Sequence, residues 1–296
     1  MDVGIIGLGA MGGQMAAALV AAGHRVLAYD VSVPALERAA AAGAEAAVSC
    51  AEVGAAASVI LLSLPTPAHV EAVVIGAAGI LTGPADGLIV VDTSTVDPDT
   101  TRRLAATAAT VGVDYLDAPV LGRPDACGNW TFPVGGDPAA LDRARPILEV
   151  LGRAVVHVGP PGSGNAIKLL NNLMFGAINA ITAEVMANCA AVGVSPRVFY
   201  ETVASSEAAT VSPLFRALGS KILEGDYAPV FTVDLMHKDV ALAMAMLDEA
   251  RAPLIVGSAV LSLIGLARAA GYGAEDSSAI VKVYETLLGL EVAKHA

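Results

Sequence analysis

Basic side chains are scarce in this sequence. Lys and Arg number 17 against 29 Asp and Glu, which gives a formal charge of −12 at pH 7. The sequence contains no cluster of basic residues, and binding to nucleic-acid phosphates or to anionic lipid requires such clusters. No uninterrupted apolar run reaches the ~20 residues of a membrane-spanning helix. The composition therefore argues against a nucleic-acid partner and against a membrane partner.

Cysteine is also rare. Cys50, Cys127 and Cys189 are far apart and odd in number, which excludes a disulfide framework. Neither they nor the five histidines show the spacing of a metal site, so we expect no metal and predict that each cysteine is a small buried side chain. Residues 1–7 enter an apolar strand at once and lack the positive segment of a signal peptide. These features predict a soluble cytoplasmic protein.

Apolar residues make up 55% of the 296 positions, which excludes a disordered chain and is enough for two domains. In the first half, short apolar runs bounded by Gly or Pro alternate with helix-like segments. This alternation predicts an α/β fold with a doubly wound parallel sheet. The expected strands are residues 3–7, 24–30, 58–64 and 87–92, with later runs at 114–119, 131–134 and 154–158, and the first helices are 11–22 and 33–42.

After residue 164 the pattern becomes helical. Residues 165 to about 192 contain one glycine and no proline, which predicts a single long helix, and helical periodicity continues to the end of the chain. We therefore expect two domains, residues 1–163 and an all-α domain of residues 164–296. A helix that is apolar on nearly all sides must be buried, within the chain or against a second subunit, so we also expect a homo-oligomer.

A glycine-rich segment follows the first predicted strand and opens the first predicted helix. Its first glycine permits a tight turn, its second lets the backbone approach a pyrophosphate, and its third allows close packing of helix and strand. The helix N-terminus adds free N–H groups and a positive dipole end. The segment therefore predicts a dinucleotide site that consists of Gly7, Leu8, Gly9, Ala10, Met11 and Gly12.

Asp30 closes the next predicted strand, 18 residues after Gly12, where a carboxylate can accept hydrogen bonds from ribose hydroxyls. A carboxylate there would repel a 2′-phosphate, and no basic residue follows before Arg38, so NAD is favoured over NADP. Ligands gather at the C-terminal ends of the strands in such sheets. We accordingly expect further cofactor contacts from Val31, Leu64, Pro65, Thr66 and Thr95. Residues 92–95 would equally suit a cap for the helix after Pro98.

Five motifs in this order resemble the β-hydroxyacid dehydrogenase family, which includes 3-hydroxyisobutyrate dehydrogenases, tartronate semialdehyde reductases and sulfolactaldehyde reductases. The resemblance implies an N-terminal Rossmann domain, a long interdomain helix, an all-α C-terminal domain that aids oligomerisation and an active site between the domains. The motifs are residues 7–12, residues 92–95, Asp117-Ala118-Pro119-Val120, Gly159-x-x-Gly162-x-Gly164-x-x-x-Lys168-x-x-x-Asn172, and Lys238-Asp239.

The resemblance makes Lys168 the general acid that protonates the substrate carbonyl while hydride arrives from the nicotinamide. An ammonium group suits this role, because partial desolvation lowers the pKa of a lysine toward neutrality. Asn172 is four residues further on and therefore shares a helix face with Lys168, so we expect it to bind substrate. The resemblance also implies that Lys238 approaches the cofactor, although an exposed helix charge pair with Asp239 is the plain alternative.

The segment after Asp117-Ala118-Pro119-Val120 departs from the family pattern. Leu121 replaces the serine that holds the substrate carboxylate, and Arg123 replaces the second glycine after it, beside Gly122. A leucine side chain donates no hydrogen bond, whereas an arginine fork can clamp a carboxylate or sulfonate. We therefore expect Leu121, Gly122 and Arg123 to form the substrate loop. The alternative for Arg123 is a solvent-exposed side chain or a pair with Asp125.

Taken together, the residues and the resemblance predict an NAD-dependent enzyme that interconverts a small anionic β-hydroxy acid and its semialdehyde, as a homodimer or homotetramer. Three alternatives stay open. One is a reductase of a semialdehyde that carries another anion, such as a sulfonate. The others are an imine reductase, a class that generally lacks this lysine, and a non-catalytic NAD-binding protein.

Overall fold

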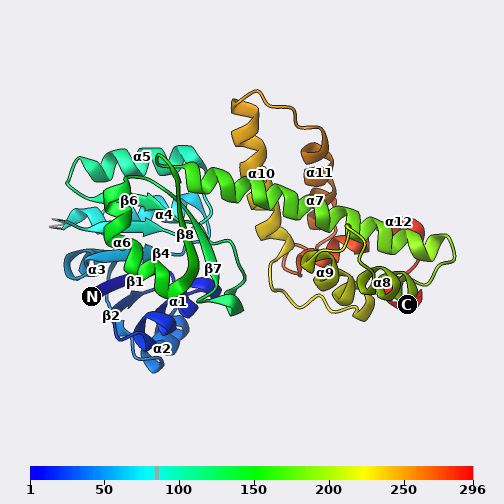
Figure 1. Ribbon diagram of the computed structural model, residues 1–296, viewed down its shortest axis with the longest axis horizontal. Coiled ribbons are helices and arrows are strands. Elements are labelled where there is room, and N and C mark those ends of the chain that lie inside the picture. The colour runs from blue at the N-terminus through cyan, green and yellow to red at the C-terminus, as the bar shows by residue number, and fades with distance from the viewer. Residues whose placement is uncertain (84–86, 296) are drawn as a thin grey trace. The chain divides into compact units, whose positions relative to one another are not determined.

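A computed structural model describes residues 1–83 and 87–295 of the protein (Figure 1). The chain divides into two compact units, Met1–Lys168 and Leu169–Ala296. The division falls inside the long helix that carries Lys168, whereas the sequence places it at residue 163, the first residue of that helix.

Unit 1 is built around one sheet whose strand order is β3-β2-β1-β4-β5-β6-β7-β8. The neighbouring pairs are parallel except β6 and β7, which are antiparallel. The predicted doubly wound sheet is therefore confirmed, with two added strands of opposite direction to the first six. The strands are β1 (Asp2–Ile6), β2 (Arg25–Tyr29), β3 (Glu45–Ala46), β4 (Val59–Leu62), β5 (Ile89–Asp92), β6 (Asp114–Asp117), β7 (Trp130–Gly135) and β8 (Gly152–Gly159).

Helices cover both faces of this sheet (Figure 1). One hydrophobic core packs α1, α2 and α6 against the sheet, and a second core packs α3, α4 and α5 against the other face. Side chains of the central strands, such as Leu61 and Val91, are fully buried, as the apolar runs predict. The helices are α1 (Ala10–Ala21), α2 (Val33–Ala41), α3 (Cys50–Ala56), α4 (Pro67–Ile75), α5 (Pro98–Ala109) and α6 (Pro138–Leu151), with short 3₁₀ turns η1 (Ile80–Thr82) and η2 (Pro124–Ala126).

Three of these helices begin with a capping residue followed by proline. Thr66, Asp97 and Asp137 accept backbone N–H groups in the first turns of α4, α5 and α6. Proline fits the next position because its fixed φ suits a helix and it has no N–H to leave unpaired. The cap of α5 is therefore Asp97, and residues 92–95 do not serve as that cap.

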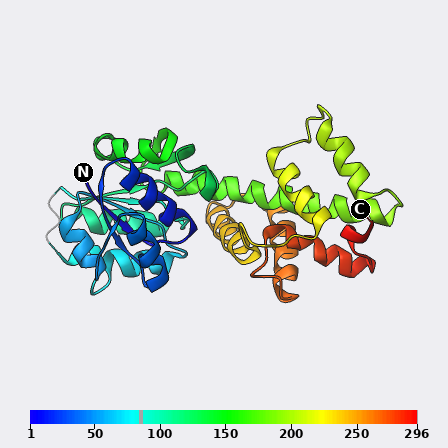
Figure 2. The same ribbon diagram turned by 90° about the horizontal axis from the view of Figure 1, so that it is seen from below.

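Helices make up unit 2, which contains no strand among its described residues. The long helix α7 enters it as one unbroken ribbon (Figure 2). Its Gly176 allows α10 and α11 to come close, because a Cβ there would lie 3.1 Å from both Val240 and Val260. The helices are α7 (Ser163–Ala191), α8 (Pro196–Ser205), α9 (Pro213–Glu224), α10 (Val233–Glu249), α11 (Ile255–Ala269) and α12 (Val281–Leu288), with 3₁₀ turns η3 (Ser277–Ile280) and η4 (Val292–His295).

By length and composition α7 is long and apolar enough to cross a membrane, and it is the one such helix in the described residues. A core helix passes the same test, and Ala183, Met186 and Ala187 of α7 are fully buried in the core of unit 2.

One of the three cysteines is not buried as predicted. Cys50 and Cys189 are buried free thiols, but Cys127 is only half-buried, because it lies in a surface loop.

Candidate active site

The sheet brings most of the predicted site residues to one edge. Strands β1, β4, β5 and β6 are parallel neighbours, so the loops that follow them all leave at their C-terminal ends. Two hydrogen bonds join the ends of β4, β5 and β6, from Leu64 N to Ser94 Oγ at 2.9 Å and from Ala118 N to Asp92 O at 2.8 Å. In an open parallel sheet this edge is where ligands bind.

The three glycines of the loop after β1 differ in what the fold requires of them. Gly7 has φ +93°, and a Cβ there would lie 2.2 Å from the Ser63 carbonyl oxygen. A Cβ on Gly12 would lie 1.9 Å from the Gly7 oxygen, whereas one on Gly9 would meet no atom within 4 Å. The fold therefore needs Gly7 and Gly12, while Gly9 leaves open space.

That open space lies at the N-terminus of α1. Gly9 is the N-cap of this helix and offers no side chain to its free N–H groups, and Gly9 and Ala10 are both exposed. Unpaired N–H groups and the positive end of a helix dipole attract phosphate groups. The residues present thus fit a dinucleotide pyrophosphate, which would occupy the space that a side chain at position 9 would fill.

Asp30 follows β2 and fixes this loop. Its carboxylate accepts Leu8 N at 2.6 Å and Ser32 N at 2.8 Å. Each oxygen keeps a further lone pair, so the carboxylate can still accept a ribose hydroxyl. Asp30 therefore holds the loop after β1 in place and can also bind a ribose. The next residue, Val31, is 89% exposed.

The remaining predicted cofactor residues follow β4 and β5. Leu64 and Thr95 are partly buried and Pro65 is exposed. Thr66 also has a structural role, since its hydroxyl caps α4 by accepting His69 N.

A buried carboxylate fixes the start of α7. Asp117, at the end of β6, is fully buried and accepts Gly162 N and Asn165 N, both at 2.8 Å. The backbones approach so closely that a Cβ on Gly164 would lie 2.7 Å from the Asp117 carbonyl oxygen. Burial raises the pKa of Asp117, and the N–H groups of Gly162 and Asn165 oppose that rise. The contacts of Asp117 thus form a clamp between β6 and α7, which explains why position 164 is glycine.

Asn165 is a second part of this clamp, and the sequence interpretation missed it. Its buried side chain donates to Thr101 Oγ1 at 3.1 Å and accepts Val96 N at 3.3 Å. The first turn of α7 is therefore held to β6 by Asp117 and to the start of α5 by Asn165. The sequence offered little signal for this role, because α7 contains several other asparagines.

Lys168 lies on the turn of α7 after this clamp. Its Nζ donates to the Val120 carbonyl oxygen at 2.7 Å and is partly buried. Val120 directly precedes the predicted substrate loop of Leu121, Gly122 and Arg123. The structure thus brings Lys168 to the base of that loop, at the C-terminal edge of the sheet.

The substrate loop presents Arg123 to solvent. Leu121 is partly buried, and Gly122 and Arg123 are exposed. Among the residues that the structure describes, no carboxylate lies within the 4.0 Å ion-pair distance of Arg123, so the alternative pair with Asp125 is not formed.

Asn172 and Lys238 belong to one polar cluster in unit 2. Asn172 is buried, and its Nδ2 donates to Asp239 Oδ2 at 2.5 Å. The other oxygen of Asp239 lies 2.9 Å from Lys238 Nζ. The side chain of Asp239 is only 4% exposed and that of Lys238 24%, so Lys238-Asp239 is not an exposed charge pair. The Asn172 amide is engaged with protein groups rather than open.

A second buried carboxylate lies beside the clamp. Asp92, at the end of β5, is paired in register with Asp117 and accepts Tyr115 OH and Ser94 N, both at 2.9 Å. Burial raises the pKa of Asp92 from 3.8 to about 6, and the Asp117 charge adds to the rise, whereas the hydrogen bonds from Ser94 and Tyr115 oppose it.

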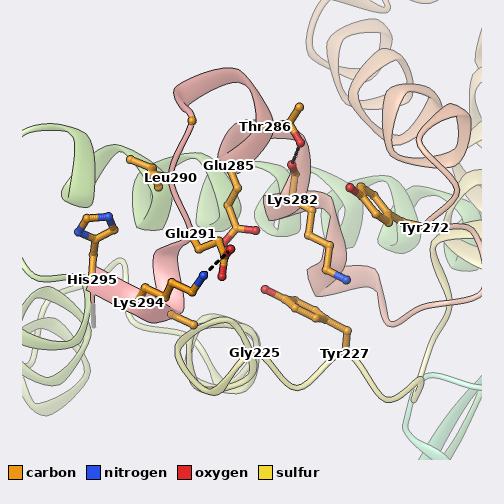
Figure 3. Close-up of a pocket in the computed structure, with 12 residues that line it drawn as sticks. Gly225, Tyr227, Tyr272, Lys282, Glu285, Thr286, Leu290, Glu291, Lys294 and His295 are labelled. Atoms are coloured by element: carbon orange, nitrogen blue, oxygen red, sulfur yellow. Dashed lines mark hydrogen bonds and ion pairs between the residues drawn. The ribbon is translucent and has the colours of Figure 1, made fainter.

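A cavity of about 730 Å³ in unit 2 is not a competing site (Figure 3). Its ammonium groups are paired, Lys282 with Glu275 and Lys294 with Glu291, and Lys282 Nζ also lies 4.2 Å from the centre of the Tyr227 ring. None of the predicted site residues lines it.

Among the described residues, no group of three or more His, Cys, Asp or Glu could hold a metal ion.

Comparisons with known proteins cover nearly the whole chain. Residues 2–159 match the family described as the NAD binding domain of 6-phosphogluconate dehydrogenase. Residues 162–284 match the family described as NAD-binding of NADP-dependent 3-hydroxyisobutyrate dehydrogenase.

Individual relatives give the same picture. The chain is 36% identical to 2-(hydroxymethyl)glutarate dehydrogenase of Eubacterium barkeri, over 99% of this chain and 98% of that protein. It is 34% identical to 3-sulfolactaldehyde reductase of Escherichia coli, over 97% of each chain. The crystal structure of 3-hydroxyisobutyrate dehydrogenase from Salmonella typhimurium matches with a TM-score of 0.88 and 31% identity, over 96% of this chain and 99% of that one.

The unequal roles of the loop glycines give a first prediction. Gly9→Ala should leave the melting temperature unchanged, because a Cβ there meets no atom within 4 Å, but should weaken NADH binding about tenfold or more by filling the phosphate space. Gly12→Ala, the matched control, should destabilise unit 1 by roughly 1–3 kcal/mol through overpacking. Thermal melts and NADH titrations measure both. A Gly9→Ala protein that binds NADH as tightly as the wild type would contradict the placement of the pyrophosphate.

The buried Asp92 gives a second prediction. Because its pKa is raised in the folded protein, from 3.8 to about 6, folding favours the protonated form, and the stability this contributes below pH 3.8 is lost as pH rises to about 6. Asp92→Asn is neutral throughout. The variant should therefore gain stability relative to the wild type between pH 4 and pH 7, by up to about 3 kcal/mol.

Urea unfolding followed through Trp130 fluorescence measures this, since Trp130 is the single tryptophan and lies buried in unit 1. Asp125→Asn, at an exposed carboxylate, is the control. A stability difference between Asp92→Asn and wild type that does not change with pH would show that the pKa of Asp92 is not raised in the folded protein.

Proposed function

The chain belongs to the β-hydroxyacid dehydrogenase family of NAD(P)-dependent oxidoreductases, and on that premise we propose that it interconverts a small anionic β-hydroxy acid and its semialdehyde with NAD. The observation that carries the proposal is the position of Lys168. Its ammonium group lies 2.7 Å from the Val120 oxygen, at the sheet edge that also carries the dinucleotide loop.

Lys168 is the proton donor and acceptor of this reaction. When bound, the dinucleotide supplies the hydride for reduction or receives it in oxidation. As the carbonyl carbon gains hydride, Nζ–H of Lys168 gives its proton to the carbonyl oxygen, and in the reverse direction the neutral amine takes the proton of the hydroxyl. A positioned acid of this kind contributes about 10²- to 10⁴-fold to the rate. The bond to Val120 and the clamp at Asp117 hold the amine ready for this transfer.

The dinucleotide contacts come mainly from unit 1. The space at Gly9 takes the pyrophosphate, and Asp30 takes the ribose hydroxyls and excludes a 2′-phosphate, which favours NAD. Lys238 is a further proposed cofactor-binding residue. The other contacts are Gly7, Leu8, Ala10, Met11, Gly12, Val31, Leu64, Pro65, Thr66 and Thr95.

Arg123 binds the acid group of the substrate. Its guanidinium is exposed and has no carboxylate partner within 4.0 Å among the described residues. Leu121 has no hydroxyl, and its backbone N–H is already bonded to the Thr131 oxygen at 2.9 Å. This arrangement also favours a second candidate, a semialdehyde that carries a sulfonate, because a guanidinium fork pairs with either anion. Asn172, one helical turn after Lys168 on α7, is a further proposed substrate-binding residue.

The protein acts as a homodimer or homotetramer in the cytoplasm. An apolar stripe on α7 supports association with a second copy. Its members are Ile167, Leu170, Met174 and Ile181, which are 38%, 44%, 64% and 55% exposed.

The proton-transfer role of Lys168 gives a third prediction. Lys168→Ala should lower kcat by about 10²-fold or more while NADH affinity stays near that of the wild type. Lys294→Ala, at a lysine that is 72% exposed, is the control and should keep full activity. Suitable substrates are serine, 3-hydroxyisobutyrate, glycerate, 4-hydroxybutyrate and a hydroxy-sulfonate, followed by NADH absorbance. An unchanged kcat in Lys168→Ala would remove this lysine from the mechanism.

The position of Asp30 gives a fourth prediction, for cofactor choice. The wild type should have a higher kcat/KM with NAD than with NADP, and Asp30→Ala should reduce that ratio, because the repulsion of the 2′-phosphate is gone. The ratio is the informative quantity, since loss of the bonds to Leu8 and Ser32 weakens both cofactors. A wild type that prefers NADP would contradict the proposal that Asp30 makes NAD the preferred cofactor.

A further inference from the structure

The loop that carries Arg123 is closed at its base. Leu121 N donates to Thr131 O at 2.9 Å, and Thr131 N donates to Leu121 O at 3.2 Å. The residues between this pair form a short closed loop. Trp130 lies directly inside the closure and is fully buried, with its ring edge-on to Phe132 at a centroid distance of 6.2 Å. The core of unit 1 thus fixes the Trp130 ring from one side.

The other side of the ring faces the loop. The indole Nε1–H of Trp130 donates to the Arg123 carbonyl oxygen at 2.6 Å. The preceding residue, Gly122, lies against the ring, since a Cβ there would be 2.4 Å from Trp130 Cδ1. The Arg123 oxygen also accepts Ala126 N at 3.0 Å, as the η2 turn begins. The Arg123 carbonyl oxygen is therefore held by two hydrogen bonds, while the Arg123 side chain is exposed.

This fixed backbone matters because of what else the loop carries. The Val120 oxygen binds the Lys168 ammonium, and Arg123 is only three residues further along. A stretch of three residues spans at most about 10 Å. The loop thus sets the separation between the group that transfers the proton and the group that binds the anion. A guanidinium on a mobile backbone would not hold that separation, and small displacements of binding groups are costly.

We propose that Trp130 is a positioning residue for substrate recognition, whose indole N–H holds the Arg123 backbone so that the guanidinium meets the acid group of the substrate. The inference rests on the proposed function, because it requires Arg123 to bind that anion. An Arg123 guanidinium held in this way selects substrates whose anion lies at a fixed separation from the carbon that exchanges hydride. Trp130 acts through Arg123 and has no contact with substrate in this assignment.

The test is a double-mutant cycle. Trp130→Phe keeps an aromatic ring in the core, although a smaller one, and removes the N–H donor, so KM should rise about 5- to 10-fold at nearly constant kcat and NADH affinity. Arg123→Ala should raise KM by roughly 10- to 100-fold, since it removes a charged hydrogen-bond donor. Because Trp130 acts through Arg123, the double variant should have the KM of Arg123→Ala alone. Asn129→Ala, at an exposed neighbour in the same loop, is the control.

The substrate is whichever of the five hydroxy acids named above the wild type turns over fastest. A KM that rises in Arg123→Ala but not in Trp130→Phe overturns this inference and leaves the proposed function intact. The inference is also overturned if the free-energy effects of Trp130→Phe and Arg123→Ala on KM are fully additive in the double variant, because a merely structural role of Trp130 would be independent of Arg123. If Arg123→Ala has no effect on KM, the inference fails because Arg123 does not bind the anion, while turnover of a hydroxy acid still supports the proposed function. If none of the hydroxy acids is turned over, the proposed function fails and the inference fails with it.

If Trp130→Phe does not fold, Gly122→Ala tests the same contact from the loop side. Its Cβ would meet the indole at 2.4 Å and displace Arg123. Gly122→Ala should raise KM in the wild type. It should leave KM unchanged when it is added to the Arg123→Ala variant. An unchanged KM in a folded Gly122→Ala protein would overturn the inference.

Discussion

The carboxylate of Asp117 at the N-terminus of α7 is the constraint on which the candidate site depends. It accepts two backbone N–H groups that the helix would otherwise leave unpaired, and it brings a negative charge to the positive end of the helix dipole. Because Asp117 ends a central strand, this contact ties the first turn of α7 to the sheet. Lys168 lies on the following turn, so the position of its ammonium group depends on that clamp.

The parallel strands bring the other parts of the candidate site to the edge where Asp117 holds α7. Strands β1, β4 and β5 end at the same edge as β6, and so the loop with the open space at Gly9 lies on the sheet edge that Lys168 reaches. One rigid sheet thus supports the helix terminus that suits a pyrophosphate, the lysine and the Arg123 loop. The close approaches explain why glycines recur in the motifs, since Gly12 and Gly164 each leave no room for a Cβ.

The sequence was most informative where periodicity controls structure. Continuous apolar runs predicted the strands of unit 1 except β3, and a stretch with a single glycine predicted α7. The direction of β7 could not be predicted, because an apolar run has no direction. Strand β3 was missed because its two residues, Glu45 and Ala46, are exposed and give no apolar signal.

The local side-chain network was harder to predict than the elements. Asp117 bonds to residues 45 and 48 positions away, and Asn165 to one 69 positions away. Such contacts depend on tertiary packing, which spacing in the sequence does not reveal. Trp130 illustrates the same limit, because nothing in the pattern joins its indole N–H to the Arg123 carbonyl. The family motifs pointed to Lys168, but only the fold explains why Gly164 before it is needed.

A crystal structure of the protein with NAD and a bound hydroxy acid would decide whether Lys168 is the proton-transfer group. The account predicts that Lys168 Nζ lies at hydrogen-bond distance, about 2.6–3.2 Å, from the hydroxyl oxygen of the acid, with Asp117 still bonded to the first turn of α7. A complex in which another side chain contacts that hydroxyl, while Lys168 remains on the Val120 oxygen, would contradict it.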